Sequence, residues 1–315
     1  LQASNRFVEE FDEIHSLLDW SRLEGLFCDI HSRVRGERAW PPLMMFKALL
    51  LQSWHNLSDP GLEKALARDL LFRRFVGMSL DQGVPDHSTI WRFRNLLEKN
   101  GLLAVAMSEI NSQLAEQSLI IKQGEVSIID ASVIEAKNAR PRKNAQGENT
   151  QDREADYNVK QASDGKRKTT YGFKAHTNVD EDGFVKAVRL TAGHVHDSTQ
   201  FEGLLTGNER EAYADSAYKS AKHSKLLKRK KIKECIHHRA YRNTPLSEAQ
   251  IRQNRYYSSI RSRVEHVFGI LKLHYGLRKA RYQGIVRNQA RVTLISMAYN
   301  LKRALSIHRE CYDDR

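Results

Sequence analysis

Residues 125–133 have the sequence Glu-Val-Ser-Ile-Ile-Asp-Ala-Ser-Val, in which a short apolar run leads into Asp130. Residues 211–218, Glu-Ala-Tyr-Ala-Asp-Ser-Ala-Tyr, repeat this arrangement around Asp215. Short apolar stretches between polar turns are typical of buried strands, so we expect each aspartate where a strand ends. A carboxylate at such a point faces solvent while the backbone that carries it stays rigid.

A third acidic residue, Glu265, lies in a helical pattern. Apolar residues recur around it at helical spacing and predict one buried stripe: Ile260, Val264, Val267, Phe268 and Leu271. Arg261, Glu265 and Lys272 fall on or beside one face of this helix. Taken alone, Arg261 and Glu265 match an ordinary surface pair one turn apart. Together with the two aspartates, they predict an oxygen-ligand site for a divalent metal, flanked by cations that suit phosphate.

With these motifs the chain resembles the DDE transposases of bacterial insertion sequences, most of all the group named after insertion sequence five. In that group the first aspartate follows a strand, as Asp130 does. The second begins a signature that ends in an aromatic residue, here Asp215 to Tyr218. The glutamate lies in an Arg-xxx-Glu-xxxxxx-Lys pattern, which residues 261–272 match.

Other segments resemble the same group and extend the resemblance from about residue 38 to residue 301. They are Pro85 to Arg94, Tyr171 to His176 and the pair His196-Asp197. Within the second segment we expect Lys174 to contact DNA. We expect His196 and Asp197 to start a helix near the active site, where they cap it or orient DNA. One position departs from the pattern, because Ser258 stands where the wider group has a tyrosine.

The resemblance implies an enzyme that binds the inverted-repeat ends of an insertion sequence and catalyses strand cleavage and strand transfer. Asp130 would bridge two Mg²⁺ ions, with Asp215 on one and Glu265 on the other; Mn²⁺ is expected to substitute. Arg261 and Lys272 would hold terminal phosphates. Two alternatives are a stand-alone metal-dependent nuclease and a catalytically silent DNA-binding regulator, and the acidic triad disfavours the regulator.

The expected fold class is α+β, with an all-helical, helix-turn-helix-like domain followed by an RNase H-like mixed sheet. The second part of this expectation comes from the resemblance. We assign residues 1–122 to DNA binding or dimerisation, 123–307 to the catalytic domain and 308–315 to a tail. Strands are expected at 125–134, 168–179, 184–193, 211–215 and 232–237, and helices near 197–205, 219–230, 253–280 and 286–306.

In the N-terminal region, Asp86 is predicted to cap a helix that runs to Leu97. The early polar face of this helix would read DNA, as the recognition helix of a helix-turn-helix does; it carries His87, Thr89 and Arg92. Trp91 and Phe93 would anchor the helix to its own bundle. A plain capped helix within a bundle is the alternative reading of the same pattern.

The composition favours a nucleic-acid partner. The chain has 51 Lys and Arg against 38 Asp and Glu, a net charge of +13, which attracts polyphosphate. The basic run at 222–233 fits either a phosphate-tracking surface or a solvated helix face. The polar segment 137–168 lacks periodicity and is expected to be a solvated insert or to become ordered on DNA.

Other features narrow the class. No apolar stretch is long enough for a membrane span, and three cysteines without paired spacing suit a reducing compartment. We therefore expect a bacterial cytoplasmic protein associated with the nucleoid, whose partner is double-stranded DNA at transposon ends and target. A homodimer or higher oligomer is expected on that DNA. A zinc site at His194, His196 and the pair His237-His238 is conceivable but lacks further ligands at suitable spacing.

Overall fold

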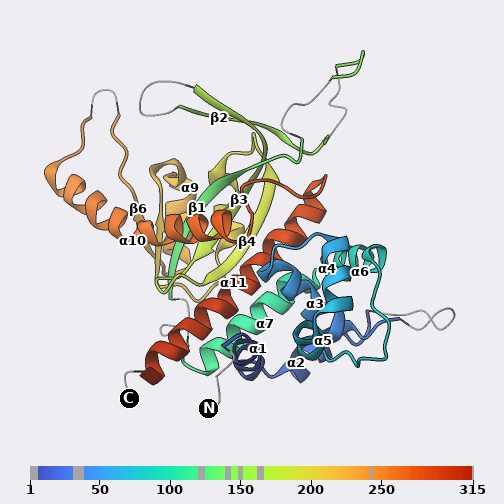
Figure 1. Cartoon of the computed structure of the whole chain (residues 1–315). Helices are drawn as coiled ribbons and strands as arrows, with labels where there is room; N and C mark the ends of the chain where they lie inside the picture. Colours follow the sequence, from blue (N-terminus) through green and yellow to red (C-terminus); the bar gives the residue numbers. More distant parts are fainter. Residues whose placement is uncertain are drawn as a thin grey trace. The chain divides into compact units, whose positions relative to one another are not determined.

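The computed structural model describes residues 6–30, 39–119, 125–138, 143–147, 152–161, 167–241 and 244–313. The chain divides into two compact units. One comprises Leu1–Leu119 with Thr293–Arg315, and the other comprises Ile120–Val292 (Figure 1). No helix among the described residues is both long and apolar enough to cross a membrane.

The first unit is helical, as expected. Its described helices before residue 119 are α1 (Arg6–Ser16), α2 (Trp20–Phe27), α3 (Pro42–Trp54), α4 (Asp59–Arg68), α5 (Leu70–Val76), α6 (His87–Lys99) and α7 (Leu102–Glu116). Every residue of α3 from Met44 to Ser53 is buried, so α3 is the central helix of this unit.

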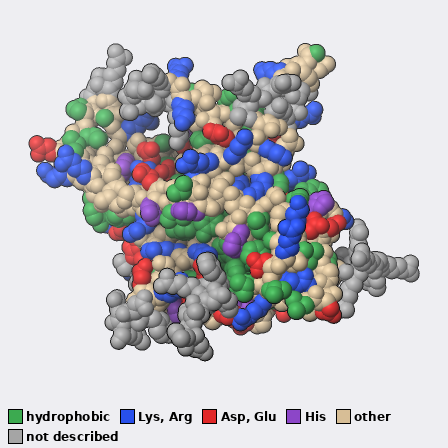
Figure 2. Space-filling view, in the orientation of Figure 1, with side chains coloured by type: hydrophobic (Ala, Val, Ile, Leu, Met, Phe, Trp, Pro, Cys, Tyr) green, Lys and Arg blue, Asp and Glu red, His purple; other side chains and the backbone are tan. Residues whose placement is uncertain are grey.

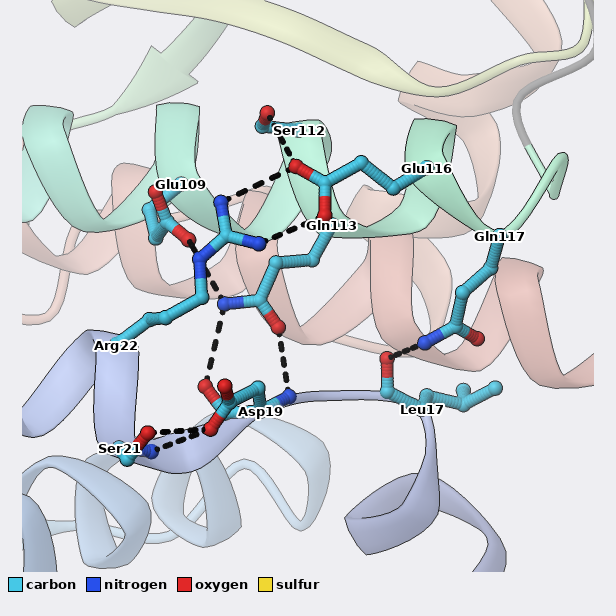
Figure 3. A network of polar contacts seen from close by, with 9 residues as sticks. All are labelled: Leu17, Asp19, Ser21, Arg22, Glu109, Ser112, Gln113, Glu116 and Gln117. Carbon is cyan, nitrogen blue, oxygen red and sulfur yellow. Dashed lines mark hydrogen bonds and ion pairs between the residues drawn. The ribbon is translucent and has the colours of Figure 1, made fainter.

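The contact between α2 and α7 shows how polar and apolar groups share the packing. Arg22 lies 2.6 Å from Glu109 and 2.7 Å from Glu116, and the Gln113 side chain accepts a hydrogen bond from the Asp19 N–H (Figure 3). Solvent screening keeps the contribution of such exposed ion pairs small. The fully buried Phe27 of α2 therefore carries more of the packing energy.

The helical unit also includes the C-terminal part of α11 (Ile285–Asp313), from Thr293 onward. The indole N–H of Trp54 donates a hydrogen bond to the Ala298 carbonyl at 2.7 Å. We expected the catalytic domain to continue to residue 307, but residues 293–307 group with the helices. The reason is a run of buried apolar side chains, among them Leu294, Met297, Ala298 and Leu301.

Helix α6 begins as the sequence predicts. The Asp86 carboxylate accepts a hydrogen bond from the Thr89 N–H at 2.7 Å. Ile90, Phe93 and Leu97 are buried and anchor the helix. Trp91 differs from these three residues, because it is 36 % exposed. The expectation that it anchors the helix within the bundle was wrong, because its side chain lies on the exposed face of α6.

The second unit is built on one six-stranded mixed sheet, β1 (Val126–Glu135), β2 (Asp156–Gln161), β3 (Arg167–Val179), β4 (Val185–Ala192), β5 (Glu211–Ala214) and β6 (Lys233–Ile236). The order is β2-β3-β1-β5-β6, with β4 also paired to β3. Strands β1, β5 and β6 are parallel, while β3 runs antiparallel to β1. The five expected strands are present within one or two residues at each end.

Strand β2 lies inside the segment expected to be an irregular insert. It pairs with β3 from Asp156 opposite Gly172 to Gln161 opposite Arg167. Tyr157 and Val159 stay largely exposed, so backbone pairing with the long strand β3, rather than burial, orders this part of the chain. Expected-insert residues 139–142, 148–151 and 162–166 lie outside the described residues.

Helices cover both faces of this sheet. One face packs on α8 (Phe201–Leu204) and α9 (Ala221–Arg229), where Ile129 and Ala214 join Leu227 in a buried cluster. The other face packs on α10 (Glu248–Leu273), where the rings of Tyr213 and Tyr257 lie 5.6 Å apart. Since neighbouring residues of a strand point to opposite faces, the residue after Ile129 points toward α10.

Candidate active site

Two aspartates meet at the carboxyl end of the short strand β5. In the parallel register of β1 and β5, Ile129 lies opposite Ala214, so Asp130 and Asp215 follow side by side. Asp215 leaves the strand and caps the short 3-10 helix η2 (Ser216–Tyr218). Both residues come after side chains that pack toward α9, and strand alternation therefore turns Asp130 toward α10.

Asp130 does not end its strand, although the apolar run before it suggested that it would, but lies in the middle of the strand expected at 125–134. Strand β1 continues to Glu135 because the longer β3 remains paired with it, up to Gly172 opposite Glu135. Only β5 ends at this level. The site therefore lies beside the middle of β1, where the neighbouring strand stops.

Arg261 of α10 reaches this pair of aspartates. Its Nη2 donates a hydrogen bond to Asp130 Oδ2 at 3.2 Å, and its side chain is only 11 % exposed. Burial tends to raise the pKa of Asp215, but hydrogen bonds from Ser216, the charge of Arg261 and the N–H groups of Ala217 and Ser216 hold that pKa below its ordinary value. The Asp215 carboxyl is accordingly ionised at neutral pH.

Glu265 lies one helical turn after Arg261, and its side chain is exposed. It makes no hydrogen bond or ion pair with any residue that the structure describes. Across the described ranges, no three His, Cys, Asp or Glu side chains are grouped closely enough to hold a metal ion. The structure thus brings Asp130 and Asp215 together and places Glu265 on the neighbouring helix, outside contact with them.

The other two predicted cations of this unit have different surroundings. Lys272 is partly buried in the last turn of α10. The ammonium of Lys174 donates to the Val195 carbonyl at 2.8 Å and lies 2.9 Å from Asp197, with 10 % of the side chain exposed. Lys174 therefore holds the chain segment before η1 (Asp197–Gln200) and presents little of its charge to solvent.

The pair His196-Asp197 does begin a helical turn, as expected. The His196 ring accepts a hydrogen bond from the Ser198 N–H at 3.3 Å and caps η1. His194, which belonged to the conceivable zinc site, lies 2.8 Å from Asp156. Helix η1 packs against η2, so Asp197 approaches the segment that carries Asp215.

Sequence reasoning assigned no role to the hydroxyl of Tyr218. The side chain is 1 % exposed and its ring lies 5.8 Å from that of Phe201. The pKa of Tyr218 lies well above its ordinary value, first because of burial and then because of three nearby carboxylates, Asp130, Asp197 and Asp215. The aromatic end of the Asp215 signature was the only sequence signal for this position.

The basic run at 222–233 forms the outer side of α9 and the turn after it. His223, Leu226 and Leu227 face the sheet. The lysines on the outer side of α9 are exposed, and Lys222 lies 3.9 Å from Glu202. At the end of the run, Lys233 pairs with Glu211 at 2.6 Å. This geometry is compatible both with a phosphate-tracking surface and with a solvated helix face.

The candidate DNA-reading residues lie on α6 of the helical unit. His87 is exposed, and its backbone N–H and ring both contact Glu63 at 2.9 and 3.0 Å. Thr89 is partly buried at the cap. Arg92 is exposed and donates to the Ser88 hydroxyl at 2.7 Å, so its guanidinium lies along the helix surface.

Comparison with known protein families agrees with this geometry. Residues 121–301, more than half of the 315-residue chain, match the family model described as the transposase DDE domain. The chain belongs to the DDE transposases. Residues 3–96 match a second model, described as a transposase domain. No solved structure matches the chain.

Membership makes this protein a phosphoryl-transfer enzyme that acts on DNA, and its family depends on divalent metal. Both matches support an insertion-sequence transposase; the group named after insertion sequence five stays a prediction. The adjacent carboxylates of Asp130 and Asp215 fit such a metal, because Mg²⁺ is commonly held by one or two carboxylates together with waters and substrate phosphates. These two carboxylates are compatible with such a metal but do not by themselves form a group of three ligands among the described residues.

Proposed function

We propose that this transposase binds the inverted-repeat ends of an insertion sequence, cleaves a strand there and joins the freed 3′-hydroxyl to target DNA. The observation that carries the proposal is the placement of Asp130 beside Asp215, with the buried Arg261 against them. Lys and Arg side chains also recur over the face shown in Figure 2, with acidic groups among them. Such a surface suits a polyanionic partner.

We assign metal binding and catalysis to Asp130, Asp215 and Glu265, with two Mg²⁺ ions as the cofactor and Mn²⁺ as a substitute. When bound, the ions activate a water or a 3′-hydroxyl and stabilise the leaving oxygen. Asp130 and Asp215 supply hard anionic oxygens from rigid strand positions. Glu265 is exposed and unengaged, so its long side chain is available to complete the set when DNA and metal enter.

We propose that Arg261 has one role in the metal-free site and another in the metal-bound site. Without metal, its charge balances Asp130 at 3.2 Å. If Asp130 held metal, the planar guanidinium would be free to donate a bidentate pair of hydrogen bonds to a terminal phosphate. Lys272 lies three turns further along nearly the same helix face and suits a neighbouring phosphate.

We propose that the helical unit recognises the end sequence through α6. The exposed Arg92 and His87 lie near the start of that helix, while Phe93 and Leu97 anchor it; recognition helices place their first turns in the major groove in this way. Two DNA ends must be held together for transposition, which requires a homodimer or a higher oligomer on DNA. The alternative is that α6 serves packing alone.

Cleavage of a labelled duplex that contains one inverted-repeat end, measured with and without Mg²⁺, tests the function. A transposase cuts at the end in the presence of Mg²⁺ and joins the product to a second duplex. Cutting of unrelated DNA at the same rate, without joining, would instead indicate a nuclease. Specific binding without any cutting in Mg²⁺ or Mn²⁺ would indicate a regulator.

A further inference from the structure

Tyr218 carries a buried hydroxyl that has no hydrogen-bond partner among the residues described. The side chain is 1 % exposed, and its oxygen is fully enclosed. A buried hydroxyl without a partner costs stability, because it gives up its hydrogen bonds to water and receives none in return. An acceptor within reach of the hydroxyl when the site is loaded would recover this cost.

The surroundings of this hydroxyl restrict the possible acceptors. The negative charges of three carboxylates, Asp130, Asp197 and Asp215, lie close enough to raise the pKa of the Tyr218 phenol. Two of them already have cationic partners, since Asp130 pairs with Arg261 at 3.2 Å and Asp197 with Lys174 at 2.9 Å.

Asp215 has no cation in direct contact among the described residues, and it lies closest to Tyr218 along the chain. Its carboxylate accepts from Ser216 and, over a long 3.4 Å, from the Ala217 N–H, and an ionised carboxylate has about four lone-pair sites. Tyr218 is tied to it through the backbone of η2, where the Tyr218 N–H donates to the Asp215 carbonyl at 3.0 Å. The side chains of Asp215 and Tyr218 therefore come from the same helical turn.

We infer that Tyr218 is a positioning residue, whose hydroxyl donates a hydrogen bond to the Asp215 carboxylate and holds it in the orientation that binds metal. The inference rests on the proposed role of Asp215 as a metal ligand. Groups that hold a metal ligand in place usually change metal affinity by 10- to 100-fold when they are removed. When this hydrogen bond forms, the Asp215 carboxylate gains a charge-assisted donor, and the buried Tyr218 hydroxyl gains the partner it lacks.

The test compares Tyr218→Phe with Tyr171→Phe in the full-length chain. Tyr171 is another buried tyrosine of the same unit, but its hydroxyl already donates to the Asp152 carbonyl at 2.6 Å. Without metal, Tyr171→Phe should lower the melting temperature, because a formed bond is lost. Tyr218→Phe should leave the melting temperature unchanged or raise it, because the ring is kept and only an unpaired hydroxyl is removed.

Metal binding supplies the readout that a purely structural role would not move. Titration calorimetry with MgCl₂ on the DNA-free chain should show affinity about tenfold weaker for Tyr218→Phe than for Tyr171→Phe or wild type. The Mg²⁺ concentration for half-maximal cleavage should rise by the same factor, with the rate largely restored at saturating metal. Equal Mg²⁺ affinity of Tyr218→Phe and wild type would overturn the inference. Absence of Mg²⁺ binding by the wild-type chain would instead overturn the proposed metal site.

Discussion

The guanidinium of Arg261 turns to Asp130, at 3.2 Å, although Glu265 lies only one turn away on the same helix. A surface pair between Arg261 and Glu265 was the simpler reading of their spacing. Arg261 pairs with Asp130 instead, because strand β1 presents this carboxylate to the buried side of α10. The arginine thereby links the helix to the aspartate pair and leaves Glu265 available.

Arg261→Ala should destabilise the metal-free protein. It removes the guanidinium that pairs with Asp130, whose side chain is 22 % exposed, and the free energy of unfolding should fall by about 2 kcal/mol. This is less than the roughly 3–5 kcal/mol for breaking a fully buried pair. Urea denaturation without divalent metal measures the change. Glu265→Gln is the matched control on the same helix and should stay within about 0.5 kcal/mol of wild type; equal losses in both variants would contradict the assignment.

Lys272 and Lys174 should differ in their effect on the salt dependence of DNA binding. Lys272→Ala should reduce the slope of log K against log salt by about 0.9, the value for one lost phosphate contact on duplex DNA. Lys174→Ala should leave the slope unchanged, because its ammonium is held by Val195 and Asp197 with 10 % exposure. Filter binding at several salt concentrations decides both. A reduced slope for Lys174→Ala would return that lysine to the DNA contacts first expected of it.

Arg92→Ala should weaken binding to the inverted-repeat end by about 1–3 kcal/mol and leave binding to unrelated duplex nearly unchanged. Its matched control is Lys99→Ala, an exposed cation in the last turn of the same helix. Competition binding with end and random duplexes gives the ratio. The full chain is needed, since residues from Thr293 onward belong to the helical unit. An unaltered ratio for Arg92→Ala would assign α6 to packing.

The buried His176 should make stability depend on pH in acid. Burial lowers its pKa to about 4 from 6.5, so the unfolded chain takes up a proton first. Its contribution is constant above pH 6.5 and is lost as pH falls toward 4, by about 3 kcal/mol in total. Asp180, whose pKa burial raises to about 7, acts in the opposite sense over much of the same range.

Comparison of wild type with His176→Gln therefore isolates the histidine. The difference in free energy of unfolding between the two should change steadily in favour of the variant from pH 6.5 to 4. Urea denaturation at half-unit pH steps measures it. A difference that is independent of pH would show that His176 is not held neutral in the folded chain.

Local pattern was sufficient for the elements that carry the site. The apolar run before Asp130 and the helical period around Glu265 predicted β1 and α10. The adjacency of Asp130 and Asp215 came from family resemblance, because it depends on pairing between residues 85 apart in sequence, such as Ile129 and Ala214, which no local period encodes.

Three further features could not be predicted from the local sequence, because they too depend on contacts between distant segments. Lys174 resembles an exposed cation in sequence, and only the neighbouring turn with Asp197 shows that it is enclosed. Strand β2 has little apolar character and is ordered by pairing with β3. Likewise, the grouping of Thr293 and later residues with the helices depends on packing against α3.

The most direct measurement is Mg²⁺-dependent cleavage of a labelled inverted-repeat duplex by Asp130→Asn, Asp215→Asn and Glu265→Gln. Each change removes a ligand charge with little change of shape, and the cleavage rate should fall by roughly a thousandfold, about 4 kcal/mol of barrier. End binding should stay close to wild type for all three. Cleavage near the wild-type rate by any one of them would contradict the assignment of that residue, and by both aspartate variants it would contradict the proposed active site.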